Sequence, residues 1–274
     1  MRIEKHIQDQ MANRFAATGK DKAKILEQLS TGKKINRASD DAAGLAMATE
    51  FDQQVRAYRN AAENIQAGMS AISIGDAGAG TISDMLQRQQ ELAVQSANGA
   101  YGQDQRDAID NEFQSLSAEI DRISKSTEFN GQKLLDGTGP LADGTGSIQT
   151  GDGASDSVTI HASDLSLNAL NLGGQKLDSP QAALQAMSAI DAAMKKVNDS
   201  RADQGSLSNR LDYALSNNQT QSVAVTQSLS NVQDLDYAKG LTEKVRTDIL
   251  SSSQEAAMSQ FNQLTRSHLL ALLQ

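Results

Sequence analysis

Residues 40–94 decide the fold, and they read DDAAGLAMATEFDQQVRAYRNAAENIQAGMSAISIGDAGAGTISDMLQRQQELAV. From Phe51 the apolar positions alternate in steps of four and three, and no proline interrupts them. This spacing is a heptad seam, which lets one helix lie along another over several turns. Ser39-Asp40-Asp41 supplies an N-cap and first-turn negative charge, and Asn98-Gly99 is the next stop signal. The stretch therefore predicts a helix of roughly 55 residues, about 80 Å long.

A second seam of the same kind follows a short polar turn. Asp104 is the expected N-cap of this helix, with Asp107 in a capping-box position, and Ile109 begins the apolar spacing. A short loop between two such helices makes them antiparallel neighbours. The residues expected in the core of the resulting rod are Phe51, Val55, Tyr58, Ile65, Met69, Ile72, Ile109, Phe113, Leu116, Ile120 and Ile123.

Both ends of the chain also have helical patterns. Residues 1–31 form an amphipathic helix that Gly32 ends with a left-handed cap. Ser179-Pro180 opens another long helix, with Ser as N-cap and Pro at the first helical position. The last helix begins near Leu235 and ends in a leucine-rich tip. The terminal helices have too little apolar surface to be stable alone, so we expect them to pair.

The segment from Leu134 to Gly174 has a different composition, in which Gly, Asp, Ser and Thr replace the heptads. Residues 147–150 and 157–160 alternate polar and apolar side chains, which predicts a small β-hairpin. The richness in Asp and Gly also suits a calcium loop. The sequences that begin at Asp143 and Asp152 lack the alternating Asp or Asn and the closing Glu of an EF-hand, so turn chemistry is the favoured interpretation.

The fold class expected is mainly α: a long antiparallel helical bundle or coiled-coil rod with a small β-hairpin region in the middle of the chain. Residues 1–31 and 235–274 are the pairing terminal helices. Residues 32–137 and 175–234 form the helical rod. Residues 138–174 form a short irregular segment, so large outer domains are not expected.

Composition excludes several classes of function. The net charge of −9 argues against a nucleic-acid or membrane surface, and no apolar run is long enough to span a bilayer. The first residues lack the apolar core of a standard secretory signal. No cysteine is present, no phosphate loop follows a strand, and His6, His161 and His268 lie in different segments. A metal site of His6 and His268 is a weak alternative, and we expect no catalytic site, no cofactor and no metal.

Four stretches resemble one protein family, the bacterial flagellins. LSTGKKINRASDDAAGLA at residues 29–46 is similar to a motif of the family, and so are LAVQSANG at 92–99 and FNGQKLL at 129–135. Near the C-terminus, RADQGSLSNRL at 201–211 resembles another. The resemblance covers residues 25–137 and 195–274.

The resemblance implies a structural, self-assembling subunit of the flagellar filament and no enzyme. In this family the terminal helices pair as the inner core of a hollow filament, and the long helices form the rod domain around it. It implies export through the flagellar apparatus to the outside of the cell. The implied partners are other flagellin subunits, the filament cap, hook-associated proteins and an export chaperone on the C-terminal helix.

A host receptor is a further implied partner, because receptor-active flagellins are sensed by toll-like receptor 5 through the rod domain. The matching positions in this sequence are Leu86, Gln87, Arg88, Leu92 and Glu112. Arg88 is the expected charged anchor, and Leu92 is expected to fill an apolar pocket beside it. Packing of this face against other subunits is the alternative interpretation.

Two departures from the family keep alternatives open. Residues 1–20 are more charged than is usual, and the opening Met1-Arg2-Ile3 is more like the hook–filament junction proteins of the same superfamily. Gln90 stands where the family often has Arg, which removes one charged contact. A junction protein is therefore the alternative function. A secreted enzyme carried on flagellin ends is a third hypothesis, but about forty irregular residues are too few for a catalytic domain.

Overall fold

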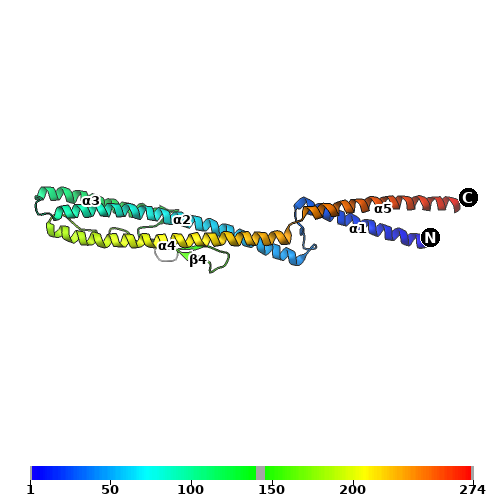
Figure 1. Cartoon of the computed structure of the whole chain (residues 1–274), viewed down its shortest axis with the longest axis horizontal. Helices are drawn as coiled ribbons and strands as arrows, with labels where there is room; N and C mark the ends of the chain where they lie inside the picture. The colour runs from blue at the N-terminus through cyan, green and yellow to red at the C-terminus, as the bar shows by residue number, and fades with distance from the viewer. Residues whose placement is uncertain (1, 140–145, 273–274) are drawn as a thin grey trace. The chain divides into compact units, whose positions relative to one another are not determined.

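The computed structural model describes residues 2–139 and 146–272, and the side chains of residues 2–4, 265 and 268–272 are left out of the description. The helices are α1 (Arg2–Thr31), α2 (Ala42–Ala97), α3 (Gln103–Ser126), α4 (Pro180–Gln233) and α5 (Tyr237–Leu272) (Figure 1). The strands are β1 (Glu128–Phe129), β2 (Gln132–Lys133), β3 (Ser147–Gln149) and β4 (Ser157–Thr159). The prediction of a mainly helical chain with a small hairpin region in its middle is confirmed.

Contacts divide the chain into two units. The terminal unit comprises residues 1–55 and 224–274, and the central unit comprises residues 56–223. The boundaries fall inside α2 and α4, because both helices run on from one unit into the other. The sequence places its boundaries at the helix ends instead, near residues 31 and 235, where the periodicity breaks.

Helix starts follow the sequence signals with two corrections. Asp41 caps α2, since its Oδ1 accepts a hydrogen bond from the Gly44 amide at 2.9 Å. Asp40 is not a first-turn charge as expected: its Oδ2 accepts from the amides of Asn36 and Arg37, in the loop before the helix. The predicted N-cap of α3, Asp104, is also wrong. Gly102 is the N-cap, and its amide donates to Gln105 Oε1 at 2.9 Å, the capping-box role expected of Asp107.

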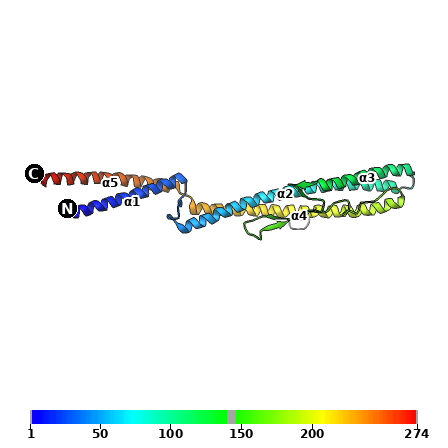
Figure 2. The same ribbon diagram turned by 180° about the vertical axis from the view of Figure 1, so that it is seen from behind.

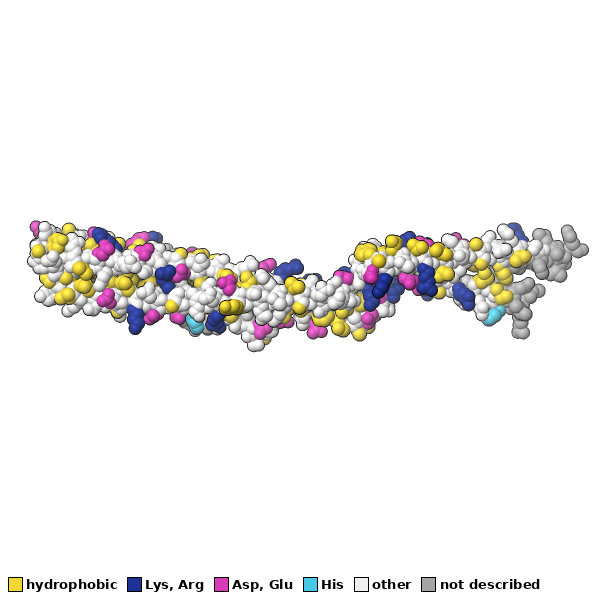
Figure 3. All heavy atoms as spheres, in the orientation of Figure 1, with side chains coloured by type: hydrophobic (Ala, Val, Ile, Leu, Met, Phe, Trp, Pro, Cys, Tyr) yellow, Lys and Arg dark blue, Asp and Glu magenta, His cyan; other side chains and the backbone are white. Residues whose placement is uncertain are grey.

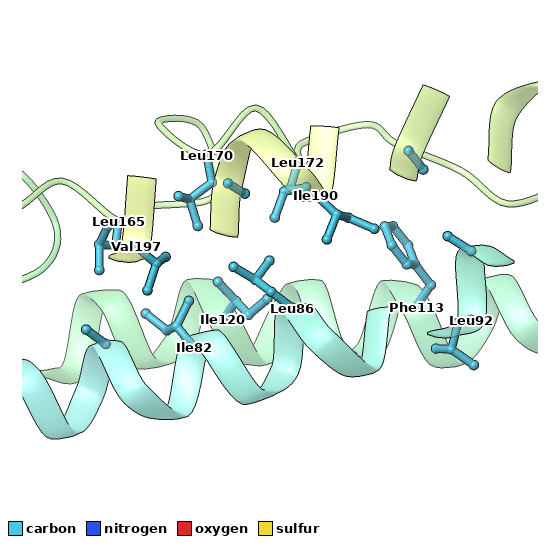
Figure 4. Close-up of a cluster of buried hydrophobic side chains, with 14 of the residues drawn as sticks. Ile82, Leu86, Leu92, Phe113, Ile120, Leu165, Leu170, Leu172, Ile190 and Val197 are labelled. Atoms are coloured by element: carbon cyan, nitrogen blue, oxygen red, sulfur yellow. The ribbon is translucent and has the colours of Figure 1, made fainter. Parts of the chain in front are cut away.

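The central unit has its core where α2, α3 and α4 meet (Figure 4). Phe113 of α3 is fully buried there with Leu86 of α2 and Ile190 of α4. The segment between β4 and α4 adds four buried leucines, although it has almost no regular structure. These leucines are Leu165, Leu170, Leu172 and Leu177. The irregular segment thus completes the core that the three helices leave open.

The residues predicted for the rod core all have reduced exposure. Tyr58, Ile65, Ile72, Ile109, Phe113 and Ile120 are buried, and Ile65, Phe113 and Ile120 are fully so. Met69, Leu116 and Ile123 are partly buried and pack against the buried clusters. Phe51 and Val55 are half-buried in the terminal unit. The heptad spacing therefore identified the buried face correctly, most completely in the central unit.

Two hairpins lie in the central unit. The predicted one pairs β3 with β4 in antiparallel register, with Ile148 opposite Val158. Both side chains pack on a cluster around Ile65, and Ile148 comes so close to Gly68 that a Cβ there would overlap it. A second hairpin, which was not expected from the sequence, pairs β1 with β2. The loop that begins at Asp143 lies outside the described residues, whereas Asp156 accepts from the Gly153 amide at 3.1 Å, as turn chemistry predicts.

Truncation of the core should destabilise the central unit. Replacing Ile65 or Phe113 with Ala is expected to cost about 2–5 kcal/mol of unfolding free energy, through lost burial and the cavity left behind. Urea unfolding of the full chain measures this cost. Ile74→Ala, at an exposed position on α2, the helix of Ile65, is the control and should cost far less unfolding free energy. Equal unfolding midpoints for Phe113→Ala and the unaltered chain would contradict the assignment.

The ion pairs of the terminal unit predict an acid transition. Hydrogen bonds from Lys22 and Lys244 hold the pKa of the Asp248 carboxyl below its ordinary value. Such a group stabilises the fold above its unfolded-state pKa and loses this contribution as the pH falls through its lower folded-state pKa. Because a single exposed ion pair contributes little free energy, circular dichroism should show only a small loss of helix below about pH 4 from this source, and Asp248→Asn should lack it. Superimposable acid profiles for the two chains would disprove the role of Asp248.

Candidate assembly and recognition surfaces

Helices α1 and α5 of the terminal unit lie side by side and antiparallel (Figures 1 and 2). One row of partly buried positions on α1 repeats in steps of four and three residues and is mostly apolar. It consists of Met11, Phe15, Thr18, Lys22, Ile25 and Leu29, and Glu27 and Gln28 near the end of the helix are partly buried as well. This row is the one that a paired helix is expected to cover.

From Gly240 to Gln254 the side of α5 that meets α1 is polar or small, and we call Gly240, Lys244, Thr247, Ser251 and Gln254 the contact row. Beyond it, the same steps of four and three continue to Met258 and Phe261, which are apolar and partly buried. Gly240 lies against Leu29, and Lys22 reaches Asp248 beside the row with 2.8 Å between Nζ and Oδ1. Along the contact row, the partly apolar side of α1 therefore faces polar and small side chains of α5.

The apolar side chains of α5 lie on a different side. We call Leu241, Val245 and Ile249 the outer row, and these side chains are 56%, 49% and 61% exposed. Hydrophobic side chains are visible along the terminal helices in Figure 3. Since contiguous exposed apolar surface is uncommon on a soluble monomer, the outer row is a candidate assembly surface.

The predicted recognition face contains an exposed arginine with two carboxylate partners. Arg88 donates through Nε and Nη2 to Glu112 Oε1, at 3.0 and 2.8 Å, and through Nη1 to Glu91 Oε2 at 2.8 Å. Hydrogen bonds to these two carboxylates raise the pKa of Arg88 above its already high value. The structure therefore brings together Arg88 of α2 and Glu112 of α3, two of the positions that the resemblance implies for this face. Glu91 was missed, although its spacing of three residues from Arg88 on one helix was a usable signal.

The two leucines predicted for this face do not lie on it. Leu86 and Leu92 are buried in the central core, as Figure 4 shows, so Leu92 has no apolar side chain to offer a partner. The physical reason is that both leucines occupy the core-facing side of α2, in step with Ile82. Gln87 is exposed as expected, and Gln90 donates to Asp191 Oδ1 on α4 at 3.3 Å.

Signs of other chemistry are absent from the described part of the chain. No group of three or more His, Asp or Glu side chains there is placed to hold a metal ion. His161 lies in the central unit and His6 in the terminal unit, while the side chain of His268 lies outside the description. Within the described residues, no helix is long and apolar enough to cross a membrane.

Comparison with known proteins covers both ends of the chain. Residues 5–139 match the family described as the bacterial flagellin N-terminal helical region, and residues 187–273 match the C-terminal helical region. A flagellin of Halalkalibacterium halodurans is 35% identical over 242 residues, which are 88% of each chain. A flagellin of Listeria monocytogenes is 34% identical and covers 86% of this chain and 87% of its own.

Solved structures agree with the sequence matches. The crystal structure of Bacillus cereus flagellin is 37% identical, with a TM-score of 0.51 over 57% of this chain and 88% of that chain. A protein assigned to the flagellar hook-associated class, from Vibrio parahaemolyticus, has a TM-score of 0.59 over 71% of this chain and all of its own. At 16% identity it shows the fold and nothing finer. Matches at both ends, and relatives of about one-third identity along most of the chain, show that this chain belongs to the bacterial flagellin family.

Proposed function

We propose that this chain is a structural subunit that polymerises into the flagellar filament used for swimming. The observation that carries the proposal is the arrangement of α5, whose polar contact row faces α1 while its outer row is exposed. Complete burial of a Leu, Val or Ile side chain is worth about 1.5–3 kcal/mol. Association that buries the three half-exposed side chains of the outer row is therefore favoured by the free energy of removing them from water.

An open polymer is the assembly that best suits this surface. A contact between two different surfaces of identical subunits, repeated without closing, generates a helical filament. We infer a contact of this kind, in which the outer row packs against a different surface of the neighbouring subunit. In the proposed filament, residues 1–31 and 235–274 form the inner core, and residues 32–137 and 175–234 form the rod around it.

The distribution of charge supports this placement. Residues 1–55 and 224–274 contain 13 Lys and Arg against 13 Asp and Glu, whereas residues 56–223 contain 12 against 21. The net charge of −9 therefore falls entirely on the central unit. A unit without net charge packs closely against its copies at little electrostatic cost, and an acidic unit is better placed towards solvent.

The remaining partners follow from the family and belong to the proposal. They are the filament cap, hook-associated proteins, an export chaperone on the C-terminal helix, and the export apparatus that delivers the subunit to the outside of the cell. A hook–filament junction protein was the alternative function. The likeness to a hook-associated protein does not favour it, because at 16% identity this likeness concerns the fold.

A charge placed in the outer row should abolish polymerisation. Ile249→Glu is expected to prevent filament growth from seeds, because burying an unpaired carboxylate opposes association. Unfolding of the central unit should stay unchanged. Ile249→Leu is the matched control, since it keeps an apolar side chain and should assemble like the unaltered chain. Electron microscopy and sedimentation measure the outcome, and normal filaments from Ile249→Glu would refute the proposed role of the outer row.

Recognition by toll-like receptor 5 is a second proposal, for the face around Arg88. With Leu86 and Leu92 buried, we expect the exposed polar residues Gln87, Arg88 and Glu112 to carry it. Arg88→Ala should weaken binding of the monomer to the receptor ectodomain by about tenfold or more, as for an interface hot spot. The matched control is Arg122→Ala, another exposed arginine paired with a carboxylate, Glu119. Equal affinities for both variants would contradict this assignment.

A further inference from the structure

Two short segments pair where α1 ends and α5 begins. The Lys34 amide donates to the Gln233 carbonyl at 2.7 Å, and the Leu235 amide donates to the Gly32 carbonyl at 2.9 Å. Lys33 and Asp234 face each other in this antiparallel bridge. We call residues 32–34 and 233–235 together the clamp.

The surroundings of the clamp require glycine at two positions. Gly32 has φ +71°, and a Cβ there would also lie 3.2 Å from the Tyr237 hydroxyl oxygen. That hydroxyl donates to the Leu29 carbonyl at 3.3 Å. A Cβ on Gly240 would lie 3.1 Å from a methyl carbon of Leu29 and 3.1 Å from one of Leu235. The end of α1 and the start of α5 therefore meet at a close and specific contact.

The rest of the α1–α5 interface specifies register weakly. Both facing rows repeat every seven residues, so a slide of one heptad sets the same sides of the two helices against each other again. The Lys22–Asp248 ion pair is about one-third exposed at its carboxylate, and such pairs contribute little. A slide of seven residues would even replace Asp248 with another acid, Glu255.

We propose that the clamp sets the register of α1 against α5 and so decides at which height along the terminal helices the outer row is presented for assembly. The pairing of two rigid helices is fixed along their whole length once it is fixed at one end, because each residue adds a constant rise. The clamp fixes the pairing at the end where α1 stops and α5 starts, through the loop segments beside the two helices. This inference rests on the proposed filament function and adds the device that aligns the terminal helices.

A zero-length coupling reagent measures the register directly. A carbodiimide joins an amine to a carboxylate that it contacts, so Lys22 should be coupled to Asp248 in the native register and to Glu255 after a slide of one heptad. The ratio of these two products, determined by mass spectrometry on soluble and on polymerised full-length chain, is the readout. In the unaltered chain the Asp248 product should dominate.

Gly32→Val and Tyr237→Leu are the clamp variants. Gly32→Val should lower the ratio of Asp248 to Glu255 product by about tenfold, because a β-branched residue is strongly disfavoured at positive φ. Gly19→Val is the matched control: Gly19 lies within α1 with no side chain or backbone near its missing Cβ, so this variant should keep the ratio. Unfolding of the central unit shows whether each variant is otherwise intact.

The outcomes separate the clamp from the filament function. An unaltered chain that forms filaments, together with an altered ratio in both clamp variants, supports the clamp. Unchanged ratios in both clamp variants overturn it, and so does the absence of any Lys22–Asp248 product in both states of the unaltered chain. An unaltered chain that never polymerises contradicts the proposed function instead, and the ratio in the soluble chain then decides the clamp.

Discussion

The packing of α5 on α1 through its polar contact row is the constraint on which the rest of the account depends. Helix pairs ordinarily bury their apolar rows against each other, and α1 does so with the row that includes Phe15. On α5, however, Val245 and its neighbours in the outer row are exposed. Within one chain, therefore, the apolar row of α1 is covered by α5, whereas α5 keeps an exposed apolar surface that another subunit can cover.

The central unit differs because its core is closed. Phe113 and Ile190 are fully buried, and the irregular segment after β4 supplies leucines where a further helix would otherwise be needed. The two units thus have different roles in a filament subunit. The central unit has a closed core and carries the net negative charge, whereas the terminal unit is neutral and leaves apolar surface exposed. The net charge of the central unit helps to keep the monomer in solution, and the exposed apolar surface of the terminal unit is buried only on assembly.

Heptad spacing predicted the helices and most buried positions, because a step of four and three residues places side chains on one face whatever their partner. The spacing did not show which other helix covers each apolar face. Leu86 and Leu92 looked like members of an exposed face, and only the positions of α3 and α4 show that they are buried. Leu165 and Leu170 could not be predicted either, since their segment has no periodicity. Asp104 failed as an N-cap because Gly102, with Gln105, caps the helix two residues earlier.

The most direct test of the central claim is amide hydrogen exchange in residues 241–250, measured on the soluble chain and on filaments grown from it. We expect only moderate protection in the soluble chain, where α5 is packed on one side and opens locally at low cost, and much stronger protection in the filament, where the outer row is buried between subunits. The central unit should show equal protection in both states and serves as the internal reference. Equal protection of residues 241–250 in the two states would contradict the account.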